Sequence, residues 1–146
     1  MKIIISGVLV LLFMSGCTIK REISPVSKVL DEKVCIVKDT NVRPGFLIAY
    51  REALEKLGYR VEVLPVNSNT NMCQVSSTYD ARWSWDLAIY MSYAKINVYE
   101  DSKLIGSALY DSTRGGGRIF DKFGNGATMI KSLVDELYSK QGTVKK

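Results

Sequence analysis

The chain of 146 residues is long enough for one domain and too short for two of ordinary size. Hydrophobic residues make up 47% and charged residues 24%, which excludes a disordered or low-complexity chain, and the net charge of +5 is mild. Histidine is absent, which excludes histidine-dependent catalytic triads and metal sites that need an imidazole ligand. We therefore expect one globular domain with no metal ion and no cofactor.

The start of the chain has the pattern of a secretory signal peptide. Lys2 supplies a positive charge, and residues 3–14 carry none. A membrane-spanning helix needs about 20 apolar residues, so this run is short for a span. The small residues Ser15 and Gly16 come next and suit a peptidase that accepts small side chains before the cut. We expect residues 1–16 to be removed as a signal peptide.

Met14-Ser15-Gly16-Cys17 resembles the lipobox of bacterial lipoproteins. In that class the cysteine thiol receives diacylglycerol, the signal is cut before the cysteine, and the new amino group is acylated. Two or three acyl chains hold a protein on a membrane essentially permanently. The resemblance thus implies lipid attachment at Cys17. The alternative is an ordinary signal peptide or an uncleaved anchor with an incidental cysteine.

The residue after the cysteine favours delivery to the outer membrane over retention at the inner membrane. Thr18 stands where, by the same resemblance, an aspartate would retain the lipoprotein at the inner membrane. We therefore expect the outer membrane, with the protein facing the periplasm. Residues 17–32 mix charges without periodicity, and we interpret them as the lipidated N-terminus followed by a tether. The tether, residues 18–32, has 15 residues and would reach about 20 to 25 Å if flexible.

Cys35 and Cys73 are the two cysteines of the expected domain, residues 33–140, which precedes a basic tail, residues 141–146. In an oxidising compartment a pair of cysteines in a small domain tends to be bridged. We expect a disulfide that closes a loop of 37 intervening residues. The alternative is two buried, reduced thiols.

Periodicity predicts the elements of the domain in chain order. Residues 33–38 are rich in β-branched side chains and predict a buried strand. Residues 39–41 offer helix-capping side chains, Pro44 suits an early helical position, and an apolar stripe predicts a helix ending near Gly58. Four further strands are predicted at 59–65, 75–83, 88–99 and 104–111, with a polar hairpin connection at 100–103. A glycine-rich stretch at 114–126 precedes a second helix, predicted at 127–140.

The order β-α-β-β-β-β-α predicts an α+β fold, a five-stranded mixed sheet with two helices packed on one face. A strand, a helix and a strand in succession favour a parallel crossover. The order over residues 33–140 resembles the N-terminal domains of TolB-like proteins and CsgG-like secretion lipoproteins. The stretch from Tyr79 to Asp111, with Trp83-Ser84-Trp85-Asp86, resembles a family of small proteobacterial lipoproteins of unassigned function. That resemblance implies a class and no activity.

Aromatic residues in the strand segments form a candidate interaction surface. Trp83 and Trp85 lie two residues apart, so their side chains share one face of a strand. Tyr90 and Tyr110, in the neighbouring strand segments, are the other members of this surface. Tyrosine and tryptophan favour interfaces because each combines a large apolar body with a hydrogen-bonding tip. The alternative is that these aromatics complete the core or its edge.

The segment 111–118 is a candidate anion-binding loop. Its glycines, with Gly116 at the centre, could let backbone amides surround an anion that Arg114 and Arg118 bind through their guanidinium groups. No Gly-Lys-Ser/Thr sequence follows, so it is not a P-loop. The alternative is a flexible connection between the last strand and the last helix.

These observations favour a non-catalytic function. We expect a lipid-anchored, periplasm-facing accessory or protein-interaction module that binds an envelope protein, the membrane through its acyl chains, and no nucleic acid. One alternative is a lipoprotein that binds a small ligand or anion through the 111–118 loop. Another is a hydrolase that uses paired carboxylates, although no spacing of aspartates in the sequence indicates that two of them converge.

Overall fold

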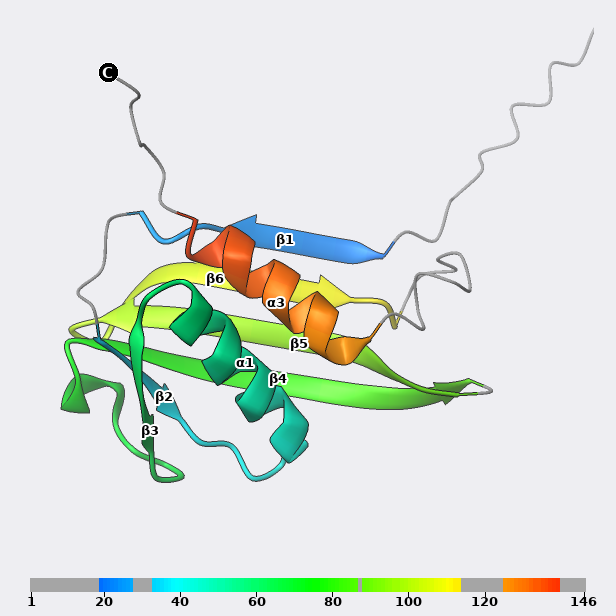
Figure 1. The fold of residues 1–146 in the computed structure, drawn as a ribbon, viewed down its shortest axis with the longest axis horizontal. Coiled ribbons are helices and arrows are strands. Elements are labelled where there is room, and N and C mark those ends of the chain that lie inside the picture. Colours follow the sequence, from blue (N-terminus) through cyan, green and yellow to red (C-terminus); the bar gives the residue numbers. More distant parts are fainter. Residues whose placement is uncertain (1–18, 28–32, 87, 114–124, 140–146) are drawn as a thin grey trace, which may run out of the picture.

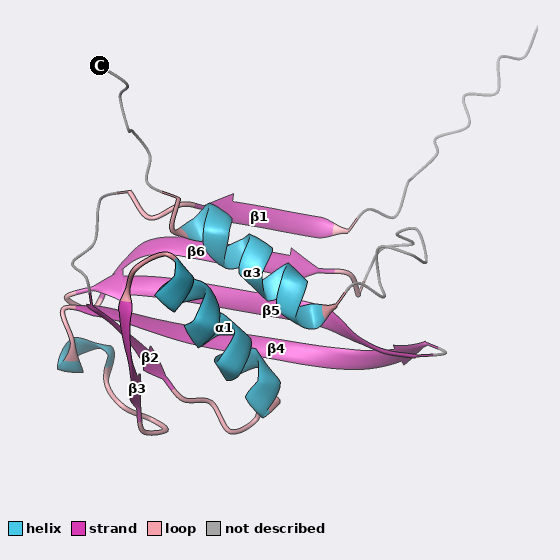
Figure 2. Cartoon of the chain, viewed as in Figure 1, coloured by secondary structure: helices cyan, strands magenta, loops and turns pink. Residues whose placement is uncertain are grey.

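Two helices lie side by side on one face of a single six-stranded sheet (Figures 1 and 2). The computed structural model describes residues 19–27, 33–86, 88–113 and 125–139. The elements are β1 (Lys20–Ser24), β2 (Lys33–Val37), α1 (Pro44–Lys56), β3 (Arg60–Leu64), the 3₁₀ helix η1 (Thr70–Met72), β4 (Val75–Asp86), β5 (Ala88–Glu100), β6 (Lys103–Asp111) and α3 (Gly126–Leu137). The predicted α+β class is confirmed.

The sheet is mixed, with the strand order β1-β6-β5-β4-β2-β3. β2 runs parallel to β3 and to β4, which confirms the predicted parallel crossover through α1. The other neighbouring pairs are antiparallel. β5 and β6 are joined by a two-residue turn at Asp101 and Ser102, both with positive φ, so the polar connection is shorter than predicted.

A sixth strand, β1, corrects the predicted five-stranded sheet. Its residues lie within the segment 17–32, which we interpreted as the lipidated N-terminus and a tether, and they pair antiparallel with the second half of β6, from Ser107 to Asp111. Three of its five residues are charged, so the segment lacks the apolar alternation that marks a half-buried strand. Tertiary contacts, described next, hold this strand in the sheet.

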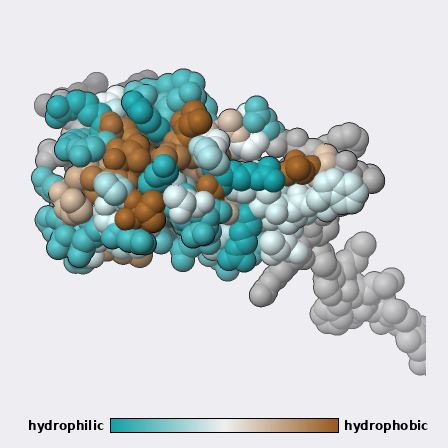
Figure 3. Space-filling view, turned by 90° about the horizontal axis from the view of Figure 1, so that it is seen from below, coloured by the Kyte–Doolittle hydropathy of each residue, from teal (hydrophilic) through white to brown (hydrophobic). Residues whose placement is uncertain are grey.

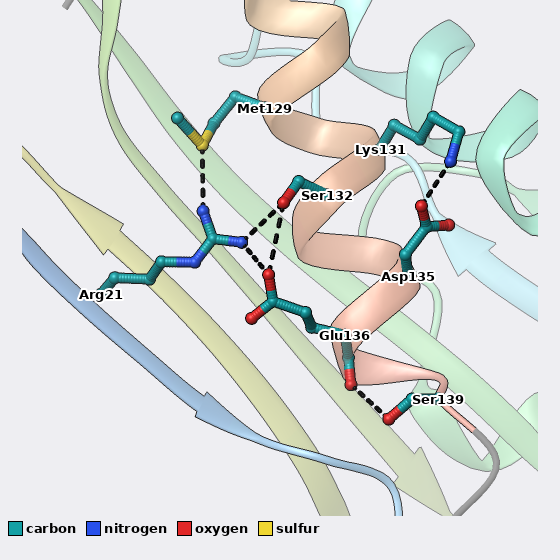
Figure 4. A network of polar contacts seen from close by, with 7 residues as sticks. All are labelled: Arg21, Met129, Lys131, Ser132, Asp135, Glu136 and Ser139. Carbon is teal, nitrogen blue, oxygen red and sulfur yellow. Dashed lines mark hydrogen bonds and ion pairs between the residues drawn. The ribbon is translucent and has the colours of Figure 1, made fainter. Parts of the chain in front are cut away.

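Arg21 connects β1 to α3 (Figure 4). Its guanidinium group donates to the hydroxyl of Ser132 at 2.8 Å, pairs with the carboxylate of Glu136, and lies 3.4 Å from the sulfur of Met129. The side chain thus crosses over β6 to reach the helix. This contact fixes β1 at a point one residue after its start.

The chain leaving β1 also packs closely on the sheet. A Cβ atom on Gly106 of β6 would lie 2.9 Å from a methyl group of Val26 and 3.1 Å from its backbone nitrogen. The buried Val26 donates its backbone N–H to the carbonyl of Leu137 at the end of α3, at 2.9 Å. Glycine at position 106 therefore makes room for this segment, which is part of the domain.

The core lies between the sheet and the two helices. α1 and α3 bury residues of the predicted apolar stripes, namely Phe46, Tyr50, Ala53, Leu54, Ile130, Leu133, Val134 and Leu137. At its centre the hydroxyl of Tyr50 lies 2.7 Å from that of Ser77 on β4 and 2.8 Å from that of Tyr138 after α3. Three elements thus meet at one buried group of hydroxyls.

The helix starts differ in how they are capped. α1 begins at Pro44, as predicted, but residues 39–41 do not cap it. The N-cap is Arg43, which makes no side-chain cap, and the Asp39 carboxylate instead accepts the backbone N–H of Asn41 in a local turn. α3 begins after Asn125, whose side chain accepts the backbone N–H of Ala127 at 3.0 Å.

Candidate interaction surfaces

A two-stranded arm projects from one end of the sheet (Figure 1). β4 and β5 remain paired as far as Asp86 and Ala88, whereas β6 ends at Asp111, opposite Tyr93 of β5. On the other side β2 pairs with β4 at Ser76 and Ser77, close to the opposite end of β4. We define the arm as residues 83–86 and 88–92.

The two tryptophans share one face of β4 but differ in environment. Trp83, at the base of the arm, is half-buried against the core, and the guanidinium of Arg43 lies 5.3 Å above its ring. Trp85 is 72% exposed, and its partner across the arm, Ile89, is 58% exposed. An exposed apolar pair therefore lies near the tip of the arm.

The structure does not bring the other two predicted aromatics into this surface. Tyr110 is only 3% exposed and belongs to the core, because it lies on the helix-covered face of β6, with Arg21 as its β1 partner and Ala94 as its β5 partner. Tyr90 pairs with Ser84 and lies on the opposite face of the arm from Trp85. The four aromatics therefore do not form one surface, and the alternative that these aromatics complete the core applies to Tyr110.

The second face of the sheet is not covered by either described helix. We define the open face as the residues of β4, β5 and β6 that alternate with the core residues, namely Thr78, Asp80, Arg82, Tyr93, Lys95, Asn97, Tyr99, Ser107 and Leu109. The guanidinium of Arg82 lies 4.6 Å above the ring of Tyr93, and Arg82 also pairs with Asp80 at 3.7 Å. Sequence reasoning missed this surface because strand alternation alone does not say which face the helices cover.

A second exposed apolar area lies at the β3 edge. Val63 on β3 and Val66 just after it are 36% and 41% exposed. Figure 3, a view from the β3 side, shows hydrophobic side chains gathered at this end of the molecule. The carboxyl ends of β2 and β3 and the neighbouring strand β4 border a hollow of about 200 Å³, lined in part by Asp39, Asn67 and Tyr79.

The shifted pKa values among the described residues belong to tyrosines of the domain interior and its margins. Burial raises the pKa of Tyr50 to about 12 and raises that of Tyr138 well above its ordinary value. Burial also raises the pKa of Tyr79, whose hydroxyl accepts the backbone N–H of Asp39 at 3.1 Å. These groups stay protonated at neutral pH, so they act there as hydrogen-bonding groups and not as bases.

Cys35 and Cys73 form the predicted disulfide, with Cα atoms 6.3 Å apart. It joins β2 to the residue after η1. The carboxylate of Glu62 lies near the two sulfur atoms, so these residues form a possible metal-binding group within the described part of the chain. The sulfurs are bonded to each other, however, and Glu62 pairs with Lys33, so this group offers no thiolate ligand.

Two predicted sites lie outside the described residues, namely the lipid-attachment residue Cys17 and the loop residues Arg114, Gly116 and Arg118. The described start of the loop is a turn in which the Asp111 carboxylate accepts the backbone N–H of Thr113 at 2.9 Å. None of the helices in the described part of the chain is both long and apolar enough to cross a membrane.

Comparison with known proteins finds a shared fold. No family model and no curated protein matches the chain. Two solved structures, both PelC dodecamers from Paraburkholderia phytofirmans, are similar. A PelC point variant has a TM-score of 0.54 at 10% identity, over 82% of this chain and 94% of that one. A second PelC dodecamer has a TM-score of 0.53 at 9% identity, over 81% and 95%. At this identity the likeness concerns the fold alone.

Proposed function

We propose that this chain is a bacterial envelope lipoprotein, acylated at Cys17 and facing the periplasm at the outer membrane, whose domain binds a protein partner and catalyses no reaction. Met14-Ser15-Gly16-Cys17 supports the lipid anchor through its resemblance to a lipobox. The Cys35–Cys73 disulfide supports export, because such bonds persist in oxidising compartments.

The open face carries the proposal of a protein partner. It combines Tyr93 and Tyr99 with Arg82 and lies on the side of the sheet that α1 and α3 leave uncovered. Tyrosine and arginine are enriched where proteins bind one another, because each combines a large contact area with hydrogen-bonding groups. Its residues lie on paired strands, so less ordering would oppose binding than for residues of a loop.

A second copy of this chain is the first partner to test. The PelC structures with the same fold are described as dodecamers, which supports self-association as one form of the interaction. A different envelope protein is the other form. Both use the open face, so one experiment addresses them together.

The test is photo-crosslinking in living cells. A photoreactive amino acid replaces Asn97 at the centre of the open face, and a matched control carries it at Ile48, which is 58% exposed on α1. We expect a defined adduct from position 97 and none from position 48. Adduct mass distinguishes a second copy from another protein. The same substitution is made at Lys95 and Ser107, which also lie on the open face. The absence of an adduct from all three positions in a folded, membrane-bound protein would overturn the proposal, and so would the same adduct from position 48.

A further inference from the structure

The arm and the proposed lipid anchor lie at the same end of the sheet. β1 begins at Lys20, which pairs with Asp111, and Asp111 pairs with Tyr93 at the point where the arm leaves the sheet. Ile89 lies four residues before Tyr93, so the tip of the arm extends about 13 Å beyond this level. The turn at 101–102 lies at the opposite end of β5.

The distance from the domain to the proposed anchor is short. Cys17 precedes Lys20 by three residues, which span at most about 11 Å. Arg21 bonds β1 to α3 through Ser132 and Glu136, and Lys20 pairs with β6, so the start of β1 is part of the domain (Figure 4). Acyl chains on Cys17 would therefore keep this end of the sheet close to the bilayer, within the reach of the arm.

The chemistry of the arm suits the headgroup region of a membrane. Trp85 and Ile89 are adjacent, exposed and beyond the cover of the helices. Tryptophan is enriched at membrane interfaces, where one side of the ring contacts acyl chains and the indole N–H meets polar groups. At the base of the arm the guanidinium of Arg43 lies over Trp83, so the arm carries a positive charge that lipid phosphates would attract.

Resting on the proposed acylation of Cys17, we propose that the arm inserts its tip into the headgroup region of a phospholipid bilayer, with Trp85 and Ile89 against lipid. The arm thus supplies a second membrane contact beside the acyl chains. Two contacts at separate points limit how the sheet can tilt. Because the arm continues β4 and β5, the strands then run at a steep angle to the membrane plane, and the open face remains accessible to a partner.

The test uses tryptophan fluorescence of the acylated, full-length protein in phosphatidylethanolamine/phosphatidylglycerol vesicles. Trp83→Phe leaves Trp85 as the single tryptophan. We expect its emission to shift to shorter wavelength, its quenching by iodide in the buffer to fall several-fold relative to the detergent-solubilised protein, and lipids brominated in the acyl chain near the headgroup to quench it.

The control places tryptophan at the other end of the molecule. Leu104→Trp, in a chain with Trp83→Phe and Trp85→Phe, lies at a residue that is 53% exposed at the start of β6. We expect iodide to quench it equally in vesicles and in detergent. Circular dichroism of each variant confirms that it is folded before it is compared.

The outcomes separate the arm from the anchor. Protein that does not stay with vesicles because Cys17 carries no lipid contradicts the proposed function. Protein that is acylated and vesicle-bound, but whose Trp85 remains as open to iodide as position 104, overturns the proposed insertion. Shielding of Trp85 that grows with protein density, without quenching by brominated lipid, also overturns it and identifies a second copy as the occupant.

Discussion

Single hydroxyl groups hold the centre of the domain together. Tyr50, Ser77 and Tyr138 come from α1, β4 and the end of α3, and each hydroxyl lies within 2.8 Å of another member of the group. Ser77 also donates to the carbonyl of Asn97 at 2.9 Å. The described residues leave no buried side-chain nitrogen or oxygen without a partner. Removing one hydroxyl would therefore disturb its neighbours as well.

We predict that Tyr50→Phe lowers the free energy of unfolding by about 1 to 3 kcal/mol, since it leaves buried hydroxyls with fewer partners. Urea unfolding of the purified domain measures this change. Tyr99→Phe, on the open face, is the matched control and should change the free energy by less than about 0.5 kcal/mol. Equal effects of the two substitutions would mean that the buried hydroxyl group does not contribute in this way.

The same tyrosine predicts how stability depends on pH. Burial raises the pKa of Tyr50 from 10.0 to about 12. Above pH 10 the unfolded chain loses this proton while the folded protein keeps it, so the stability present below pH 10 is lost as pH rises towards 12. Urea midpoints measured across this range should fall, and they should fall less steeply in Tyr50→Phe. Parallel curves for the two proteins would contradict this assignment.

At the level of elements, Arg21 is the β1 side chain that reaches α3. Arg21 donates to Ser132 and pairs with Glu136, whereas Lys131 on the same helix pairs with Asp135 at the surface. We predict that Arg21→Ala lowers the free energy of unfolding by about 1 kcal/mol, because its guanidinium is partly buried and makes charged hydrogen bonds. It should also speed hydrogen exchange in β6, whose outer edge β1 covers.

The control for Arg21→Ala is Lys131→Ala, which removes an exposed pair between residues four apart and should change stability by less than about 0.5 kcal/mol. If Arg21→Ala left both stability and exchange in β6 unchanged, β1 would be held by its backbone pairing with β6 and by the packing of Val26 on Gly106, without a contribution from Arg21. The short distance between the domain and Cys17 would then no longer follow from this contact.

On the scale of the whole molecule, the disulfide links segments 38 residues apart in sequence. Cys35 lies in β2 and Cys73 follows η1, so the bond ties the loop before β4 to the sheet. We predict that the double variant Cys35→Ala, Cys73→Ala loses about 2 to 4 kcal/mol of unfolding free energy, as does the reduced protein. Unchanged urea midpoints in the presence of reductant would contradict this expectation.

Much of this architecture follows from apolar periodicity. The stripe from Phe46 to Leu57 and the stripe from Ala127 to Tyr138 predicted most of the buried faces of α1 and α3, because residues three or four apart share a helix face. Leu57 and Ala127, at the ends of these stripes, are exposed. β1 could not be predicted in the same way. Its residues are mostly charged, and it is held by Arg21 and by the space at Gly106, which are contacts between residues far apart in sequence.

The candidate surface was harder to predict for a related reason. The sequence shows that Trp83 and Trp85 share a face, but not that β4 and β5 extend beyond their neighbours. That difference in strand length leaves Trp85 exposed, while Tyr110, one of the same predicted group, is buried beneath the helices. The position of an aromatic relative to the helices, which tertiary packing sets, therefore decides between core and surface.

The proposed lipid anchor is tested most directly by intact mass spectrometry of the protein purified from the membranes of the cells that make it. The account predicts a mature chain that begins at Cys17 and carries the added mass of diacylglycerol and an amide-linked fatty acid, and a Cys17→Ser variant that lacks this mass and leaves the membrane fraction. A native chain with an unmodified amino terminus and no fatty acid would contradict the account.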